Sequence, residues 1–286
     1  MTDRSLTDWL AAKPAVLQGK GPIAIILCED DAAIAETLDH HLGLGFRHIL
    51  ALSAEPVDQR LPALRDARVT NLIHDCRRAD AHVEAVNAVI AAAAPGLWLY
   101  YAYNAEFLFF PFSESRSVGE MLAFHTEERR AAMLCYAIDL YARDLTVAPD
   151  AVDIDGAMFD PRLHFALSPD GTERRLDFHG GLRWRFEDRL PADRRRIDRI
   201  ALFRTEHGLR LQADHRLNRA EMNTYSCAWH HNLTAAIASF RVAKALVSNP
   251  GSREGIDSFV WAGSAPFDWR AQQLLDLGLM EPGQWF

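Results

Sequence analysis

The sequence predicts an α/β protein built on an open, doubly wound and mainly parallel sheet. In its N-terminal part, short apolar runs alternate with amphipathic stretches, and glycine or proline marks several of the junctions. Short continuous apolar runs are typical of strands that are buried on both faces, as in parallel sheets. Repeated alternation of such strands with helices indicates a sheet covered by helices on both sides.

The first strand, helix and strand set this pattern. Residues 23–27 (IAIIL) follow Gly21-Pro22 and are predicted as a buried strand. Residues 31–44 carry Ile34 and Leu38 at helical spacing and are predicted as an amphipathic helix. Residues 48–52 (HILAL) form the next apolar run. The three elements together predict a right-handed βαβ unit with parallel strands.

The same pattern continues further along the chain. A third strand is predicted at 69–73, an alanine-rich helix at 80–94 and a fourth strand at 97–103. In open α/β sheets, ligands bind outside the carboxyl ends of the strands, near the point where the strand order reverses. We therefore expect the functional residues among the polar side chains that directly follow these strands.

The rest of the chain is less regular. Helices are predicted over 117–134 and 234–247, and the prolines between residues 145 and 215 predict short strands separated by breaks. We expect one domain over residues 1–286, with a regular half at 22–112 and an irregular half at 113–286.

Composition excludes several classes of protein. The formal net charge of the 286 residues is −8, which argues against general binding to nucleic acids. No apolar run is long enough to predict a membrane span. The N-terminus has no apolar signal segment, and the cysteines include no CxxC pair, so we expect a cytoplasmic protein with free thiols. The sequence also lacks GxGxxG and GxxxxGK[ST], which argues against the usual dinucleotide and P-loop sites.

Acidic residues follow the first strand, and each has two interpretations. Glu29, Asp30 and Asp31 can accept hydrogen bonds from a base or a ribose, or they can cap the following helix. Glu106 follows the fourth strand, where it is either a metal ligand or a surface acid. Asp75 follows the third strand and would be the phosphoacceptor if this were a receiver domain. Such a domain needs a lysine after its fifth strand, and none lies between residues 21 and 243.

Two further groups carry possible chemistry. Arg183 and Arg185 follow Gly180-Gly181 and, at i and i+2 of a strand, would share one face and could clamp phosphates. Alternatively they form a salt-bridged face beside the acids Glu187 and Asp188. His230 and His231 would point to opposite faces of a strand, so at most one of them would face a site.

Taken in order, several segments resemble the motifs of bacterial family 2-like glycosyltransferases. IAIILCEDDAAIAETLDHHLGLGFRHILALS resembles the opening of that family, with Asp30 in place of the motif's Glu. WLYYAYNAEFLFFP resembles its W-x-x-x-x-D-x-D-E-F-L segment, and GGLRWRF its G-G-x-R-x-R-x-F. Weaker matches occur at Asp139-Leu140-Tyr141, Met158-Phe159-Asp160, Arg199-Ile200-Ala201-Leu202, His215 and Ala228 to Asn232. The resemblance covers residues 22–280.

The resemblance implies a GT-A fold that binds a nucleotide-diphosphate sugar at the strand ends, usually with Mn²⁺ or Mg²⁺, and moves the sugar to an acceptor hydroxyl. It also implies roles for individual residues. Asp139 is the expected base, with Asp188 as its rival, and Glu106 and His230 are the expected metal contacts. The expected nucleotide-sugar contacts are Glu29, Asp30, Ser53, Arg77, Asn104, Arg183 and Arg185.

The chain departs from the family pattern at charged positions. Tyr103 and Ala105 replace the two acids of D-x-D, Ser53 replaces an aspartate, and Asn232 replaces a lysine. The sequence is therefore compatible with two functions. One is a glycosyltransferase with a shifted or absent metal site, in which Arg183 and Arg185 offset the diphosphate charge. The other is a catalytically inactive relative that serves as a binding or scaffolding protein. A receiver-like signalling domain is a distant third.

Overall fold

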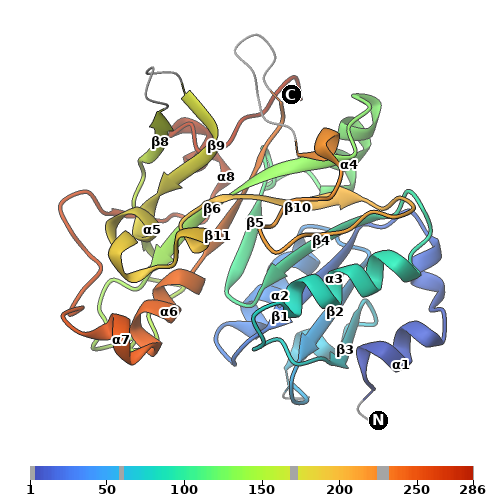
Figure 1. Cartoon of the computed structure of the whole chain (residues 1–286), viewed down its shortest axis with the longest axis horizontal. Coiled ribbons are helices and arrows are strands. Elements are labelled where there is room, and N and C mark those ends of the chain that lie inside the picture. Colours follow the sequence, from blue (N-terminus) through green and yellow to red (C-terminus); the bar gives the residue numbers. More distant parts are fainter. Residues whose placement is uncertain (1–3, 58–60, 168–172, 224–231, 286) are drawn as a thin grey trace. The chain divides into compact units, whose positions relative to one another are not determined.

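The computed structural model describes residues 4–57, 61–167, 173–223 and 232–285. The chain forms two compact units whose segments interleave along the sequence (Figure 1). The first unit comprises Met1–Asn104, Ser115–Leu134 and Ile200–Thr224. The second unit comprises Ala105–Glu114, Cys135–Arg199 and Tyr225–Phe286.

The first unit contains the predicted parallel sheet. Its strands are β1 (Ile23–Cys28), β2 (His48–Ser53), β3 (Val69–Ile73) and β4 (Trp98–Tyr103). They lie in the order β4-β1-β2-β3, and each neighbouring pair is parallel. The C-terminal residues of β10 (Asp198–Arg204) pair antiparallel with β4. The predicted strands and their parallel pairing are thus confirmed, and β1 is fully buried because it has a neighbour on each side.

Helices of the first unit are α1 (Leu6–Ala11), α2 (Ile34–Gly43), α3 (Ala81–Ala92) and α4 (Val118–Glu127). Short 3₁₀ turns occur at Ala15–Gln18, Pro62–Arg65 and Ala220–Met222. Across the described residues of both units, no helix has the length and apolar character needed to cross a membrane.

The prediction of one helix over 117–134 is wrong at its C-terminal end. Ser117 and Glu120 form a capping box that starts α4, but the helix ends at Glu127. Arg129 then adopts a φ of 59°, a left-handed conformation that reverses the chain. The apolar residues that follow belong to β6 (Ala132–Tyr141), which is buried along nearly its whole length.

The second unit is built around β5 (Glu106–Phe109), β11 (Ala235–Ser239) and the C-terminal part of β6. β11 pairs antiparallel with β5 and parallel with β6. β6 also pairs with β7 (Met158–Phe159), and β7 pairs with β12 (Ala265–Pro266). A separate hairpin is formed by β8 (Leu163–Leu167) and β9 (Glu173–Gly180).

The helices of the second unit are short. They are α5 (Gly181–Arg185), α6 (Arg241–Ser248), α7 (Pro250–Arg253) and α8 (Ala271–Asp276), with 3₁₀ turns at Glu187–Arg189 and Ala192–Arg194. The predicted helix over 234–247 is wrong in its first half, because Ala235–Ser239 is the buried strand β11. A short apolar run with strand neighbours on both sides cannot be told from a buried helix by its periodicity.

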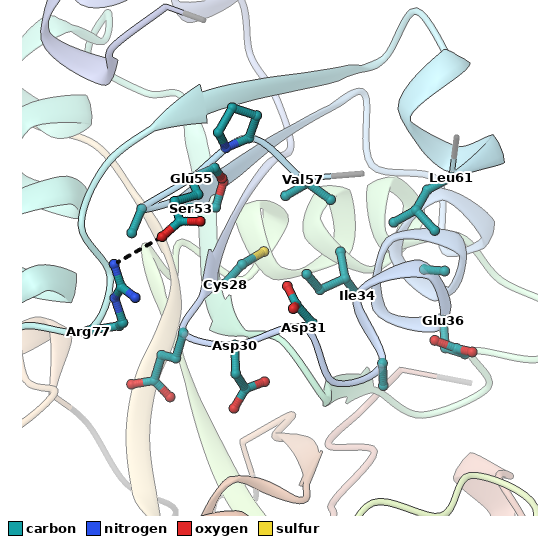
Figure 2. A pocket seen from close by; sticks show the side chains of 15 residues that line it. Cys28, Asp30, Asp31, Ile34, Glu36, Ser53, Glu55, Val57, Leu61 and Arg77 are labelled. Carbon is teal, nitrogen blue, oxygen red and sulfur yellow. Dashed lines mark hydrogen bonds and ion pairs between the residues drawn. The ribbon is translucent and has the colours of Figure 1, made fainter. Parts of the chain in front are cut away.

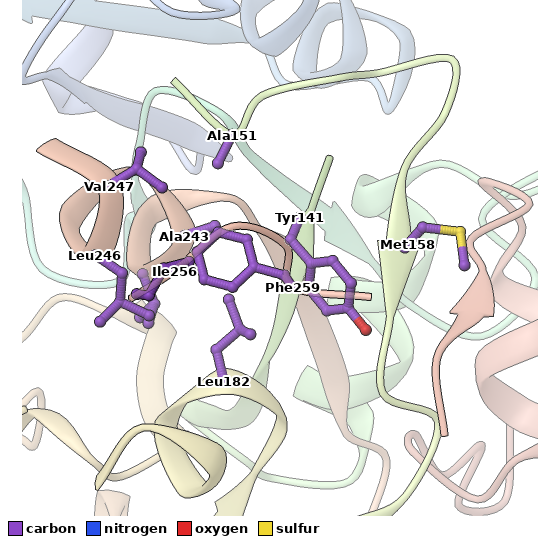
Figure 3. Packing of buried hydrophobic residues seen from close by; sticks show 10 residues of the cluster. Tyr141, Ala151, Met158, Leu182, Ala243, Leu246, Val247, Ile256 and Phe259 are labelled. Atoms are coloured by element: carbon purple, nitrogen blue, oxygen red, sulfur yellow. The ribbon is translucent and has the colours of Figure 1, made fainter. Parts of the chain in front are cut away.

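An apolar cluster in the second unit joins α5 and α6 to β6 (Figure 3). Ala243, Leu246 and Val247 of α6 lie close to Phe259 and Tyr141, and Leu182 of α5 belongs to the same cluster. Leu182 and Phe259 have no exposed surface. Burying a side chain of this size contributes about 1.5–3 kcal/mol. The cluster fixes α5 and the arginines that it carries.

His125 is a buried histidine near the end of α4. Its side chain is 1% exposed, its Nε2 lies 2.8 Å from the carbonyl oxygen of Ala132, and its Nδ1 has no hydrogen-bond partner among the described residues. Burial lowers the pKa of His125 to about 4, although the Ala132 carbonyl acts in the opposite direction. The folded protein therefore holds this imidazole neutral at pH values where the unfolded chain already binds a proton.

We expect His125 to make the protein acid-sensitive. Because its folded pKa is depressed, its contribution to stability is complete above about pH 6.5 and is lost as the pH falls towards 4. Between pH 7 and pH 5 this one group should remove about 2 kcal/mol of unfolding free energy. Urea unfolding at both pH values should show a smaller difference in His125→Gln. His207→Gln, at an exposed histidine, is the matched control, and an equal pH difference in both variants would contradict the prediction.

Candidate functional site

A cavity of about 980 Å³ opens at the carboxyl ends of β1 and β2 in the first unit (Figure 2). We call it the strand-edge cleft. It is lined by the loop after β1, by the first turn of α2, and by the loop after β2 together with Leu61 and Arg77. Its size lies near the upper end of the range for small-molecule sites, roughly 300–1,000 Å³.

The cleft lies over β1 and β2, next to the point at which the chain order of the sheet reverses. In the strand order β4-β1-β2-β3, chain order reverses between β1 and β4. Loops after neighbouring strands leave in opposite directions at such a point, and ligands of open α/β sheets bind there. Asp30 and Arg77 both line the cleft, as expected. Glu106 was expected with them, but it is fully buried and does not line the cleft.

Asn104, directly after β4, holds the loop after β1 in place. Its Oδ1 accepts a hydrogen bond from the Glu29 N–H at 2.9 Å. Its Nδ2 donates to the Asp30 carboxylate and to the Ala32 carbonyl oxygen at 2.8 Å. Asn104 has no exposed surface, so it positions the cleft wall instead of presenting an amide to a ligand.

Ser53 has a similar structural role in the loop after β2. Its Oγ donates to the carbonyl oxygen of Glu55 at 2.6 Å, and Ser53 is only 6% exposed. Glu55 in turn lies 3.9 Å from Arg77, whose side chain is 60% exposed. An ion pair this long and this exposed contributes little free energy. Arg77 is therefore available to a ligand, whereas the Ser53 hydroxyl fixes the cleft wall.

The charge of the cleft is mainly negative. Its lining includes five carboxylates and one arginine, namely Glu29, Asp30, Asp31, Glu36, Glu55 and Arg77. Apolar side chains occupy one end, where Ile34, Val57 and Leu61 lie together in Figure 2. The cleft thus has an apolar end and an acidic end. Sequence reasoning found Asp31 but missed Glu36 and Glu55, since only the fold brings the loops after β1 and β2 together.

The first turn of α2 also lines the cleft. Ala33 adopts a φ of 49°, and no side chain caps the helix that begins at Ile34. Unsatisfied N–H groups at a helix N-terminus carry a partial positive charge and favour anionic or polar acceptors. This helix end and Arg77 are the positive features of an otherwise acidic cleft.

Glu106 is part of a buried ion pair in the second unit. Its carboxylate accepts hydrogen bonds from Arg199 at 2.7 and 3.1 Å and from the Ser239 hydroxyl at 2.9 Å. Both side chains are almost completely buried. Arg199 was only a weak motif match in the sequence. In the structure it binds Glu106, the acid that was expected to hold a metal.

Of the two predicted metal contacts, Glu106 is engaged by an arginine. Both of its oxygens accept from Arg199, Tyr103 is 2% exposed, and the Ala105 side chain has no ligand atom. His230 lies outside the described residues. Among the residues that the structure describes, no group of three or more His, Cys, Asp and Glu side chains could hold a metal ion.

The expected base and the expected phosphate clamp are joined to each other. Arg183 donates from Nε and from its backbone N–H to Asp139 at 3.0 and 3.1 Å, and from a terminal nitrogen to the Arg196 carbonyl oxygen. Burial raises the pKa of Asp139, and Arg183 opposes that shift. Gly181, at φ 59°, permits this approach, because a Cβ there would lie 3.1 Å from the Asp139 carboxylate. The arginine is thus a structural partner of Asp139.

Arg185 is also engaged within the second unit. It lies 3.3 Å from the Asp160 carboxylate, donates to the Phe259 carbonyl oxygen at 2.7 Å, and stacks over Trp261 at 5.0 Å. The predicted strand face is wrong, because both arginines lie on the helix α5. Each does form a salt bridge, but with Asp139 and Asp160 instead of the neighbouring acids. Asp188 is exposed on a 3₁₀ turn.

The sheet argues against the receiver alternative. Receiver domains have the strand order 2-1-3-4-5, in which the strand before the phosphoacceptor lies beside the first strand. Here β3 lies beside β2 at the far side of the sheet from β4. Asp75, two residues after β3, is exposed and pairs with the neighbouring Arg77 at 3.5 Å.

Comparisons with known proteins do not place the chain in a family. No family model matches the sequence. No curated protein matches it either.

We expect Asn104 to be required for the shape of the cleft. Asn104→Ala removes the hydrogen bonds to the part-buried Glu29 N–H and to the carbonyl oxygens of Asp30 and Ala32, which should cost about 1–3 kcal/mol of unfolding free energy. Asn104→Asp should cost at least as much at pH 7, because a carboxylate cannot donate to these oxygens and lies beside Asp30. Urea unfolding measures the loss, and amide NMR shifts of residues 29–36 report on the loop.

Asn87→Ala is the matched control, since that amide also holds a backbone segment, at Leu211, but away from the cleft. It should lower stability without shifting residues 29–36. If Asn104→Ala is as stable as the natural protein, the hydrogen bonds of Asn104 do not hold the loop after β1 in place.

We expect the Glu106–Arg199 pair to behave as a buried structural ion pair. Glu106→Gln leaves a buried arginine without its counter-charge and should lower the unfolding free energy by about 3–5 kcal/mol. The double change Glu106→Gln with Arg199→Met should cost less than the sum of the single changes. Glu84→Gln, in the exposed Arg78–Glu84 pair, should cost no more than about 1 kcal/mol. Additive single costs, measured by denaturant unfolding, would contradict the pairing.

Proposed function

We propose that this protein is a glycosyltransferase-like binding protein that holds the nucleoside half of a nucleotide-diphosphate sugar in the strand-edge cleft. One observation carries the proposal. The cleft at the carboxyl ends of β1 and β2 is open, whereas Glu106, Asp139, Arg183 and Arg185 are all engaged in internal ion pairs. A ligand site is thus present without the predicted means of metal-dependent transfer.

The two ends of the cleft suit the two parts of a nucleoside. Ile34, Val57 and Leu61 offer an apolar surface on which a planar base can be buried (Figure 2). Ionised carboxylates are hydrogen-bond acceptors only, so Asp30 and its acidic neighbours suit a ligand that donates from hydroxyl groups. The ribose of a nucleoside supplies such donors.

Charge decides which part of the ligand the cleft favours. Two unit charges 4 Å apart interact by about 1 kcal/mol in water and by about 4 kcal/mol near a protein surface. Five carboxylates facing a diphosphate therefore oppose it more than Arg77 and the α2 N-terminus attract it. The neutral nucleoside contributes the binding energy, and the diphosphate weakens it.

A second candidate is an active glycosyltransferase. It is favoured by the carboxylates Glu29 and Asp31 at the cleft, since a carboxylate can act as the base for an acceptor hydroxyl. In that case the base is a cleft residue, and Asp139 keeps its structural role beside Arg183.

Nucleoside diphosphate release separates the two candidates. The protein is incubated with a panel of nucleotide sugars, with and without Mn²⁺ and with a set of simple saccharide acceptors, and the freed diphosphate is measured. The binding function predicts no release above background, together with a thermal shift that does not depend on Mn²⁺. Release that is lost in Asp31→Asn would establish the transferase with a cleft base. Release that requires Mn²⁺ would show that the protein has a working metal site, contrary to the proposal.

We expect salt to act oppositely on neutral and charged ligands. Salt screens the repulsion between the cleft carboxylates and a diphosphate. Isothermal titration from low to physiological ionic strength should therefore show nucleoside diphosphates binding more tightly as salt rises, and the matching nucleoside binding almost unchanged. Glu36→Gln should strengthen diphosphate binding and leave nucleoside binding unaltered, with Glu84→Gln as the control. Diphosphate binding that weakens with salt would instead indicate an arginine clamp.

A further inference from the structure

A second cavity lies within the second unit, beside β7, β12 and α8. Its volume is about 360 Å³, within the range of small-ligand pockets. Phe159 and Ala265, which are paired across β7 and β12, line it together with Pro161 and Leu277. The polar side chains that line it come from the segment 268–276. We call it the α8 cavity.

The polar wall of the α8 cavity is held by an unusual turn. Trp269 has a φ of 61°, a conformation that bulky residues rarely adopt and that is found mainly where a surrounding structure enforces it. Its indole donates to the Ile154 carbonyl oxygen at 2.9 Å and meets the ring of Phe107 edge-on at 4.8 Å. The anchored indole holds the turn that carries Asp268 and Arg270, and the Arg270 N–H donates to the Asp268 carboxylate at 3.2 Å.

The helix on the same side is fixed as well. The Glu114 carboxylate accepts a hydrogen bond from the N–H of Ala271, the first residue of α8. Gln273 donates to the Pro266 carbonyl oxygen at 2.9 Å and accepts from the Asp268 N–H at 3.1 Å. These bonds join α8 to β12 and to the turn, so the cavity is formed in the absence of a ligand.

The opposite wall is supported by Asp160, between the lining residues Phe159 and Pro161. Its Oδ1 accepts from the Tyr141 hydroxyl at 2.6 Å and from the Trp261 indole at 2.9 Å. Ser264, next to the lining residue Ala265, lies 2.7 Å from the same Tyr141 hydroxyl. Asp160 and Ser264 are therefore positioning residues for this wall.

The chemistry of the lining selects one class of ligand. Two aspartates and one arginine give a net charge of −1, so a strongly charged ligand gains little. Asp268 and Asp276 are acceptors, Arg270 is a donor, and Gln272 and Gln273 are both. Gln272 donates to Asp276 at 2.7 Å, which orients both side chains on α8. Pro161 and Leu277 leave an apolar surface of limited size, and Phe159 beside them is itself fully buried.

From this lining we infer that the α8 cavity is a binding site for a neutral saccharide. A sugar ring presents hydroxyl groups, each a donor and an acceptor, around its edge and C–H groups on its faces. Alternating acids, amides and an arginine match the edge, and the small apolar floor matches a face. The inference does not depend on the nucleoside cleft, which belongs to the other unit and offers acids and an apolar end instead.

Saccharide titration followed by NMR tests the site. The probes are glucose, galactose, mannose, N-acetylglucosamine and rhamnose, each also as its methyl glycoside. At least one should cause saturable shifts of the amides of residues 268–277 and of the Trp269 indole N–H. The double change Gln272→Ala with Asp276→Ala should weaken its apparent affinity at least tenfold. Both replacements lie on the exposed side of α8, where alanine favours the helix, and the melting temperature checks folding.

Gln212→Ala with Asp214→Ala is the matched control, because it removes the same two side-chain types from an exposed segment of the first unit. It should bind the saccharide like the natural protein. The inference is overturned if no saccharide shifts residues 268–277, if the α8 variant binds like the control, or if inorganic phosphate binds the cavity in preference to every saccharide. Nucleoside titration of the same sample reports separately on the strand-edge cleft.

Discussion

The amide of Asn104 is the interaction on which the strand-edge cleft depends. It lies at the end of β4 and bonds to the backbone of the loop that follows β1. Parallel strands end at the same edge of a sheet, but nothing in their pairing fixes the loops beyond them. The Asn104 amide is fully buried and bonds to a donor and two acceptors of one loop. It fixes that loop at the point where the strand order reverses. The cleft wall is thereby formed before a ligand arrives.

The second unit uses charged residues in a similar way. Three arginines, Arg183, Arg185 and Arg199, are held by Asp139, Asp160 and Glu106. A buried arginine is costly unless a carboxylate and further hydrogen bonds satisfy it. Arg183 and Arg185 each donate to a backbone carbonyl as well, and Arg199 makes two hydrogen bonds to Glu106. These pairs engage the side chains that resemble a catalytic set in the sequence.

This arrangement changes what the resemblance to glycosyltransferases means. A transferase must offset the charge of a departing diphosphate, and the side chains expected to do so are internal. The open cleft is still suited to the neutral half of such a ligand. A neutral saccharide site in the other unit would give the chain two ligand sites of related chemistry that operate without a metal. In the function that we propose, binding is separated from transfer.

The sequence alone determined the parallel sheet of the first unit, since strands such as Ile23–Cys28 are continuous apolar runs and need no context to be recognised. It also located the cleft, because polar residues after such strands must meet at one edge. Tertiary structure decided the rest. Ala235–Ser239 became a strand only because β5 and β6 lie beside it. Glu106 and Arg199, 93 residues apart, became an ion pair only because folding buried both and neither charge could remain alone.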